Sequence, residues 1–186
     1  GTYYIQAGSP FPGPANLVLN VEQVPPPPND DFATARVIDT RPFVESVDLT
    51  SATTEPSEPL LPSQAFTQIV GSAWYVFTPD VTGSVTANYS SCCVPPMLAV
   101  YTGSSLGALT EIASRSFGQP ITFQAIADTT YYFQLDRGIL QGGTAPMTFR
   151  LEQTPPPVVN FGYMPGDPSV FDLVQFFDFS FDPGQV

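Results

Sequence analysis

Residues 129–157 read TTYYFQLDRGILQGGTAPMTFRLEQTPPP, and residues 1–28 read GTYYIQAGSPFPGPANLVLNVEQVPPPP. Both stretches open with a Tyr-Tyr motif, which is followed by a turn rich in glycine and by a strand-like run. Both stretches then end in a run of prolines. Residues 1–28 are therefore a diverged repeat of residues 129–157.

The two copies match at two places. YYIQ at 3–6 corresponds to YYFQ at 131–134, and LNVEQVP at 19–25 corresponds to FRLEQTP at 149–155. Self-similarity over the length of a whole domain is typical of tandem arrays. We therefore interpret residues 1–24 as the last hairpin of a preceding domain.

The two proline runs mark the predicted domain boundaries. Residues 25–28 and residues 155–157 are prolines throughout, which predicts stiff polyproline II linkers. The 29–154 stretch between them is long enough to bury its own core. We expect it to be one complete domain.

Short apolar runs alternate with turn residues within this predicted domain. Residues 84–89 alternate with a period of two, which places Val85, Ala87 and Tyr89 on one buried face. AWYVFT at 73–78 is apolar on both faces and predicts a central strand with Trp74 as a core anchor. Further strands are predicted at 43–49, 97–101, 121–126, 131–135 and 147–151. The pattern predicts an all-β, antiparallel β-sandwich.

A family resemblance runs through the same domain. It is carried in order by NDDFATARVI, TTEPSEP, SAWYVFTPDVTGSVTAN, MLAVYTGSSLGALTEIA and ITFQAIADTTYYFQLD. These segments resemble the bacterial pre-peptidase C-terminal (PPC) type domain. The resemblance implies a jelly-roll-like β-sandwich on secreted and cell-surface proteins, often in tandem and usually without catalysis of its own.

Residues 158–186 read VVNFGYMPGDPSVFDLVQFFDFSFDPGQV and resemble the opening of a PKD-type domain. The positions that fit that pattern are Asn160, Phe161, Tyr163, Pro165 and residues 167–172. The resemblance implies a strand at DPSVFD and a partial β-sandwich at this end of the chain, as at the other end. The phenylalanines of this segment, if left exposed, would form an aggregation site, so we expect something to cover them.

Composition restricts the classes of partner and compartment. The 17 acidic residues and 5 arginines give a net charge of −12, whereas nucleic acids and anionic membranes bind clustered cations. No apolar run approaches the roughly 18–20 residues of a membrane span, so no membrane insertion is expected. Only 12% of the residues are charged and lysine is absent, which we read as favouring an extracellular or cell-surface setting. The chain opens without a signal peptide, so we expect a mature or internal segment.

The residue types for most catalytic sites are missing. The chain has no histidine, which excludes nucleophile–histidine catalysis and histidine-based zinc sites, and two cysteines cannot close a structural zinc site. A pair of glycosidase carboxylates is an alternative that the sequence leaves open, but nearly every acidic residue stands beside Pro, Gly, Ser or Thr, as solvated turn residues do. We expect no catalytic residue and no enzymatic activity.

Three acidic or amide side chains, Asn29, Asp30 and Asp31, follow the first proline run. Such side chains accept backbone N–H groups, so one interpretation is a helix cap or Asx turn at the start of residues 31–37. The alternative is a calcium site built from the same carboxylates. We favour the cap, and we expect no other cofactor.

Two modification sites stand out. Cys92 and Cys93 are adjacent, with Cα atoms about 3.8 Å apart, which is shorter than the separation in an ordinary disulfide. The alternatives are two free thiols, bonds to other chains, or a vicinal disulfide, and we favour the disulfide as a stiff turn. Asn88 lies in the N-glycosylation pattern Asn-Tyr-Ser.

The favoured function is that of a non-enzymatic structural module in a tandem-domain surface protein, stalk or filament. Expected partners are neighbouring domains or identical subunits, joined by strand addition in a homo-oligomer or filament. The alternative is an accessory module of a secreted hydrolase that binds its substrate or a polysaccharide.

Overall fold

A computed structural model describes residues 2, 4–8, 16, 18–59, 69–91, 96–116, 118–138, 146–154 and 156–180. The side chains at 69, 70, 96, 137 and 138 are outside this description. The strands are β1 (Arg36–Val37), β2 (Phe43–Val47), β3 (Ile69–Phe77), β4 (Gly83–Ser90), β5 (Pro96–Thr102), β6 (Thr110–Ser116), β7 (Ile121–Ala125), β8 (Tyr131–Gly138), β9 (Met147–Thr154), β10 (Phe161–Met164) and β11 (Gln175–Asp178). Two 3-10 turns, η1 (Phe32–Thr34) and η3 (Leu106–Ala108), are the helical elements of the described residues, and neither could cross a membrane.

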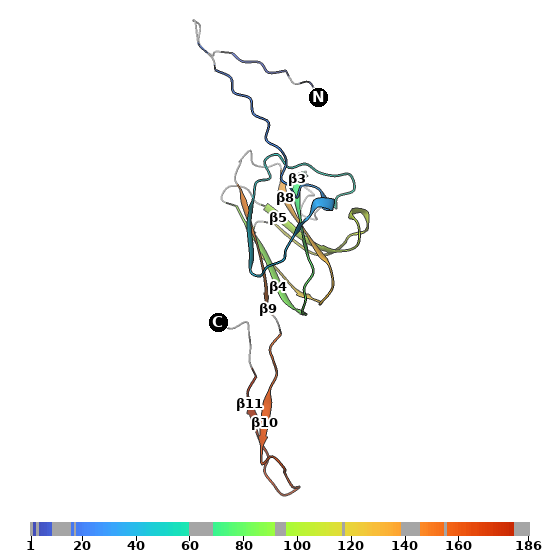
Figure 1. Cartoon of the computed structure of the whole chain (residues 1–186), viewed down its shortest axis with the longest axis vertical. Coiled ribbons are helices and arrows are strands. Elements are labelled where there is room, and N and C mark those ends of the chain that lie inside the picture. The colour runs from blue at the N-terminus through green and yellow to red at the C-terminus, as the bar shows by residue number, and fades with distance from the viewer. Residues whose placement is uncertain are drawn as a thin grey trace.

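Nine of these strands form two packed sheets (Figure 1). One sheet has the order β1-β3-β8-β5-β6 and the other the order β2-β9-β4-β7. All neighbours are antiparallel except β1, which runs parallel to β3. Antiparallel pairs join β2 to β9, β3 to β8, β4 to β7 and β5 to β6, which is the nested pairing of a jelly roll. The predicted all-β, jelly-roll-like sandwich is confirmed.

The core lies between the two sheets and is rich in aromatic rings. Phe149 of β9 is at its centre, with ring centroids 4.5 Å from Tyr75 and 5.7 Å from Phe133 of the opposite sheet. On β4 every second residue is buried, as the sequence predicts. Period-two burial is what holds each strand in register, because a slip of one residue would expose the apolar face.

A second apolar cluster lies on the outer face of the five-stranded sheet. Successive side chains of β3 point to opposite faces of the sheet, and Trp74 points to this outer face. It is fully buried there by the cluster around it. The other buried members of this cluster are Met97, Ala99 and Tyr101 of β5, and the side chains packed against it include Phe32, Ala35, Leu106 and Leu109. The expectation that Trp74 anchors a core is confirmed, but this core is separate from the one between the sheets.

The hairpin expected within residues 1–24 requires strands at 2–7 and 16–24, and these strands do not form in the part of the two ranges that the structure describes. The described residues there are extended and exposed, with no strand partner among the described residues. The physical reason is that two strands without a further sheet gain too little burial to be stable in water.

The repeat also implies that residues 129–157 form the last hairpin of their own domain, and this expectation is wrong. β8 lies between β3 and β5 in one sheet, whereas β9 lies between β2 and β4 in the other. The connection therefore crosses from one sheet to the other, as jelly-roll connections do. Residues 1–24 match this segment in sequence. The repeat therefore equates their two strand-like runs with β8 and β9, which lie in different sheets.

β10 and β11 form a separate two-stranded sheet beyond the second proline run (Figure 1). The resemblance to a PKD-type domain implies a strand at residues 167–172, but these residues lie in the turn between β10 and β11. Ser169 N donates a hydrogen bond of 2.7 Å to Asp172 Oδ2 within that turn. Short polar side chains that bond nearby backbone groups favour turns over strands.

Candidate functional site at the two poles of the sandwich

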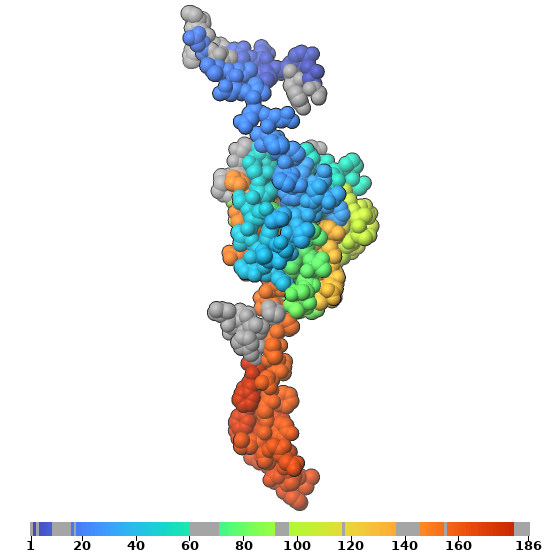
Figure 2. All heavy atoms as spheres, viewed as in Figure 1, coloured from blue at the N-terminus to red at the C-terminus, as the bar shows by residue number. Residues whose placement is uncertain are grey.

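The chain reaches and leaves the sandwich at opposite ends. At one end, Asn29 lies beside Trp74 and the proline run leads away from it; we call this end the N-terminal pole. At the other end, Thr154 of β9 pairs with Ser84 at the start of β4; we call this end the C-terminal pole. Figure 1 and Figure 2 show the proline run and the β10–β11 hairpin extending from these two ends.

Asn29 is hydrogen-bonded to β3 in both directions at the N-terminal pole. Trp74 N donates to the Asn29 carbonyl oxygen at 2.8 Å, and Asn29 Nδ2 donates to the Trp74 carbonyl oxygen at 3.0 Å. Asn29 is 7% exposed, so these bonds are shielded from competing water. The residue thus acts as a one-residue strand on the edge of β3.

Asp30 fixes a second segment to the same place. Thr53 donates to both carboxylate oxygens of Asp30, from its backbone N at 2.7 Å and from its hydroxyl Oγ1 at 2.6 Å. Asp30 is 7% exposed, and hydrogen bonds to a charged acceptor are stronger than neutral ones. The Thr53 carbonyl oxygen in turn accepts a bond of 3.0 Å from Ser72 N of β3.

The last prolines of the linker belong to the same contact. Ser51 Oγ donates to the Pro25 carbonyl oxygen at 2.6 Å, and Asp30 N donates to the Pro27 carbonyl oxygen at 3.0 Å. We call residues 25–30, together with Ser51 and Thr53, the N-terminal anchor. It occupies the edge of β3 that β1 leaves open, so the proline run begins from a fixed position.

The helix-cap expectation is wrong in its details. Asp31 precedes η1, but its side chain makes no capping hydrogen bond, and η1 is only a three-residue 3-10 turn. The helical run expected over residues 31–37 gives way to β1, because Phe32 packs on Trp74 with ring centroids 5.2 Å apart. Tertiary packing here outweighs the local preference that the sequence suggests.

The calcium alternative concerns the same three residues. Asn29 and Asp30 direct their side chains to Trp74 and Thr53, while Asp31 is exposed. Within the described ranges, no three His, Cys, Asp or Glu side chains gather as a metal-binding group.

Glu58 is a partly buried acid that the sequence analysis did not single out. Its Oε1 accepts hydrogen bonds from Ser72 Oγ at 2.8 Å and Trp74 Nε1 at 3.3 Å, while its Oε2 is buried without a partner. Burial raises the pKa of Glu58 above its usual 4.5, although the bonds from Ser72 and Trp74 act in the opposite direction. The loop after Thr53 is thereby attached to the outer face of β3.

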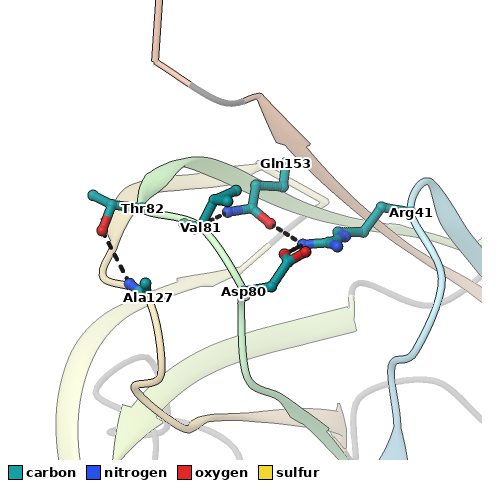
Figure 3. Close-up of polar contacts among 6 residues, drawn as sticks. All are labelled: Arg41, Asp80, Val81, Thr82, Ala127 and Gln153. Atoms are coloured by element: carbon teal, nitrogen blue, oxygen red, sulfur yellow. Dashed lines mark hydrogen bonds and ion pairs between the residues drawn. The ribbon is translucent and has the colours of Figure 1, made fainter.

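Arg41 joins its own loop to the loop of Asp80 and to the end of β9 at the C-terminal pole (Figure 3). Its Nη1 donates to Asp80 Oδ1 and to Gln153 Oε1, both at 2.5 Å, and Gln153 Nε2 donates to the Val81 carbonyl oxygen at 2.6 Å. The Arg41 guanidinium also lies 5.8 Å from the centre of the Phe77 ring. The hydrogen bond from Arg41 lowers the pKa of Asp80. The end of β9 is thus tied to its neighbouring loops just before the chain leaves the sandwich.

The β10–β11 hairpin has aromatic side chains on both faces. Phe161, Tyr163 and Phe176 share one face, with ring centroids 6.3 Å apart in each neighbouring pair. On the other face, Phe177 and Phe179 stack at 6.4 Å, and Phe179 lies against Gly162. A hairpin that is apolar on both faces has the pattern of strands buried on both sides.

Of the predicted modification sites, the structure describes Asn88 but not the cysteine pair. Asn88 is exposed on β4 opposite Arg150, so its side chain reaches solvent. Cys92 and Cys93 lie outside the described residues, so the favoured vicinal disulfide stays a prediction.

Sequence reasoning missed Glu58 and the cluster around Arg41, because their partners are distant in the chain. Gln153 and Arg41 are separated by most of the domain, and neither stands in a recognisable motif. One usable signal was present: the repeat pairs Gln153 with Gln23, each just before a proline run.

Comparisons with known proteins do not extend the family resemblances. No protein-family model and no curated protein matches the chain. Two solved structures are similar to it at low identity. The Yersinia pseudotuberculosis-derived mitogen is 9% identical with a TM-score of 0.39, over 60% of this chain and 86% of that one. A glycosylation-associated protein complex from Streptococcus agalactiae is 8% identical with a TM-score of 0.29, over 60% of this chain and 44% of that one.

Proposed function

We propose that this chain is a non-enzymatic structural module of an extracellular stalk or filament, in which neighbouring sandwiches are linked and complete one another with β-strands. The observation that carries this proposal is the internal repeat. Residues 1–24 have the sequence pattern of β8 and β9, and each of those strands lies between two partners in a different sheet. Strands of that kind need partners on both edges, which a neighbouring domain or subunit would supply.

The state of the N-terminal residues supports this reading. Val18, Leu19 and Val21 are exposed, although the repeat equates Leu19 and Val21 with Phe149 and Leu151, which are buried in β9. Exposed apolar side chains in a group mark an interaction surface, so we infer that another sheet covers these residues. The resemblance to tandem PPC-type domains assigns that sheet to a preceding sandwich.

The hairpin supports the same proposal at the other end. The exposed fractions are 63% for Phe161, 48% for Tyr163, 68% for Phe176, 37% for Phe177 and 61% for Phe179. With about 200 Å² for each aromatic side chain, roughly 500–600 Å² of aromatic surface is open. One partner in a standard interface contributes about 800 Å². Val158, Val159 and Met164 are exposed beside these rings, so the hairpin offers an area of that order.

The composition favours an extracellular setting for such a module. The chain carries 12% charged residues and no lysine, so its polar surface consists largely of uncharged side chains. The net charge of −12 opposes binding to nucleic acids and anionic membranes. Homotypic contacts through apolar strands are compatible with this charge because most of the exposed large apolar side chains lie within residues 4–24 and 158–179.

The test is the intact mass and assembly state of the native protein. We expect either a mass far above 20.0 kDa, with several domains in one chain, or a mass of 20.0 kDa in an ordered polymer. A native protein of 20.0 kDa that stays monomeric at high concentration would refute the structural proposal. Retention of such a monomer on insoluble polysaccharide would instead favour the role of an accessory binding module.

A further inference from the structure

The two poles define the direction in which a linked array would load this domain. Tension enters through residues 25–30 at one pole and leaves through the end of β9 at the other (Figure 1). β3 runs from the N-terminal pole to the C-terminal pole, because Ser72 lies beside the anchor and Phe77 lies beside Arg41. The strands are therefore aligned with the pulling direction.

The N-terminal segment runs along β3, and the hydrogen bonds that join the two lie across the pulling direction. Asn29 pairs with Trp74, β1 pairs with Tyr75 and Val76, and Ile38 N donates to the Val76 carbonyl oxygen at 2.9 Å. Tension on the proline run slides this segment lengthwise past β3. Bonds that lie across the direction of sliding share the load and must break together, whereas bonds in a peeled strand break one after another.

The C-terminal strand is loaded in the same way. Thr154 at the end of β9 is pulled away from the sandwich, and β9 would slide between β2 and β4. β9 has five paired positions with β2 and seven with β4. The N-terminal segment has a two-residue strand and a few anchor bonds, so it is the weaker of the two attachments.

We propose that the N-terminal anchor is a mechanical clamp, in which Asp30 and Asn29 hold the linker to β3 in shear and set the tension that the domain withstands. This inference rests on the proposed structural role and adds a load-bearing function to it. Asp30 is central because its two bonds to Thr53 fix the linker to a second segment, which is itself bonded to Ser72. Sliding of the linker must therefore break the bonds to Trp74 and Thr53 together.

The adjacent acids offer a matched pair of variants. Asp30→Asn replaces one charged acceptor by an amide donor that faces the Thr53 donors, whereas Asp31→Asn makes the same chemical change on an exposed side chain without a capping bond. Ile121→Val shortens a buried side chain of β7, an edge strand that is joined to neither linker. This third variant lowers stability without touching the load path.

The experiment is single-molecule pulling of the 186-residue chain between handles at its two termini. Unfolding of residues 29–154 should release roughly 40 nm of chain in its main step. At a fixed force, we expect Asp30→Asn to unfold at least about tenfold faster than the wild type, since a bond to a charged group is lost. Asp31→Asn should unfold at the wild-type rate.

The competing explanation is a general loss of stability, and the Ile121→Val variant tests it. We expect Ile121→Val to lower the melting temperature but to change the unfolding rate under force much less than Asp30→Asn does. Equal acceleration at an equal loss of melting temperature would overturn the clamp, as would an Asp30→Asn rate equal to that of Asp31→Asn. If Asp30→Asn does not fold, Thr53→Val removes one of the two bonds and should accelerate unfolding less, but in the same direction. Each result is independent of the native assembly state, which tests the structural role separately.

Discussion

Gly71 of β3 has no room for a side chain, so its replacement by alanine should be costly. A Cβ atom at this position would lie 2.4 Å from the Ala52 carbonyl oxygen and 2.7 Å from the Ala52 carbonyl carbon. Ala52 is buried, and the next residue, Thr53, accepts a bond from Ser72 and donates two to Asp30. Gly71→Ala would therefore push the loop that supports the N-terminal anchor away from β3.

The magnitude follows from the contact distances. Ordinary van der Waals contacts of a Cβ atom lie at 3.4–4 Å, so the Ala52 backbone must retreat by about 1 Å. Overpacking of this kind costs about 1–3 kcal/mol. For a domain of this length, each kcal/mol lowers the melting temperature by roughly 4 °C.

Trp74 provides the assay, because it is the only tryptophan and is fully buried in the native state. Its fluorescence during urea or thermal unfolding reports the loss of the outer-face cluster. Gly107→Ala is the matched control, since nothing lies within 4 Å of a Cβ atom there. A Gly71→Ala variant within about 0.5 kcal/mol of the wild type, the scatter of neutral surface changes, would refute the reasoning. An equal loss in Gly107→Ala would refute it as well.

Three further predictions concern the partly buried Glu58, the candidate metal ligands and the hairpin. Because the folded state raises the pKa of Glu58 above 4.5, its contribution to stability is full below pH 4.5 and is lost as the pH rises through the raised value. Glu58→Gln should therefore flatten the fall in melting temperature between pH 4.5 and neutrality, and an unchanged pH profile would count against this account. Chelation of calcium should leave the melting temperature unchanged, since Asp30 is satisfied by Thr53, and a large loss would instead indicate a bound ion. Phe176→Ser should reduce the binding of a hydrophobic dye and any self-association, whereas the same change at the buried Phe149 should unfold the sandwich.

Local patterns in the sequence were enough for the strands with strong alternation. Val85, Ala87 and Tyr89 are buried on β4 as predicted, because a period of two can satisfy only one face of a sheet. Residues 73–77 of the predicted apolar run likewise lie in β3, which has a partner strand on each side, β1 and β8. In contrast, β6 (Thr110–Ser116) was missed, because an edge strand with mostly exposed residues leaves no such pattern.

The candidate site was also predicted only in part from the sequence. The sequence singled out Asn29 and Asp30 for a local cap or turn, but Asn29 donates to Trp74 and Asp30 accepts from Thr53, both of which are distant in the chain. It could not name Thr53 and Trp74 as their partners, because those residues meet them only after the sheets form. The five arginines gave no sign that Arg41 would reach Asp80 and Gln153.

The sequence by itself determined the all-β class and the residues that face the core, since side-chain periodicity and turn residues act over a few neighbouring positions. The tertiary structure alone decided which sheet each strand joins. β8 and β9 look like one hairpin in the sequence, yet they lie in opposite sheets. Strand pairing depends on contacts between segments that are distant in the chain, and no local pattern encodes which distant edge a strand will meet.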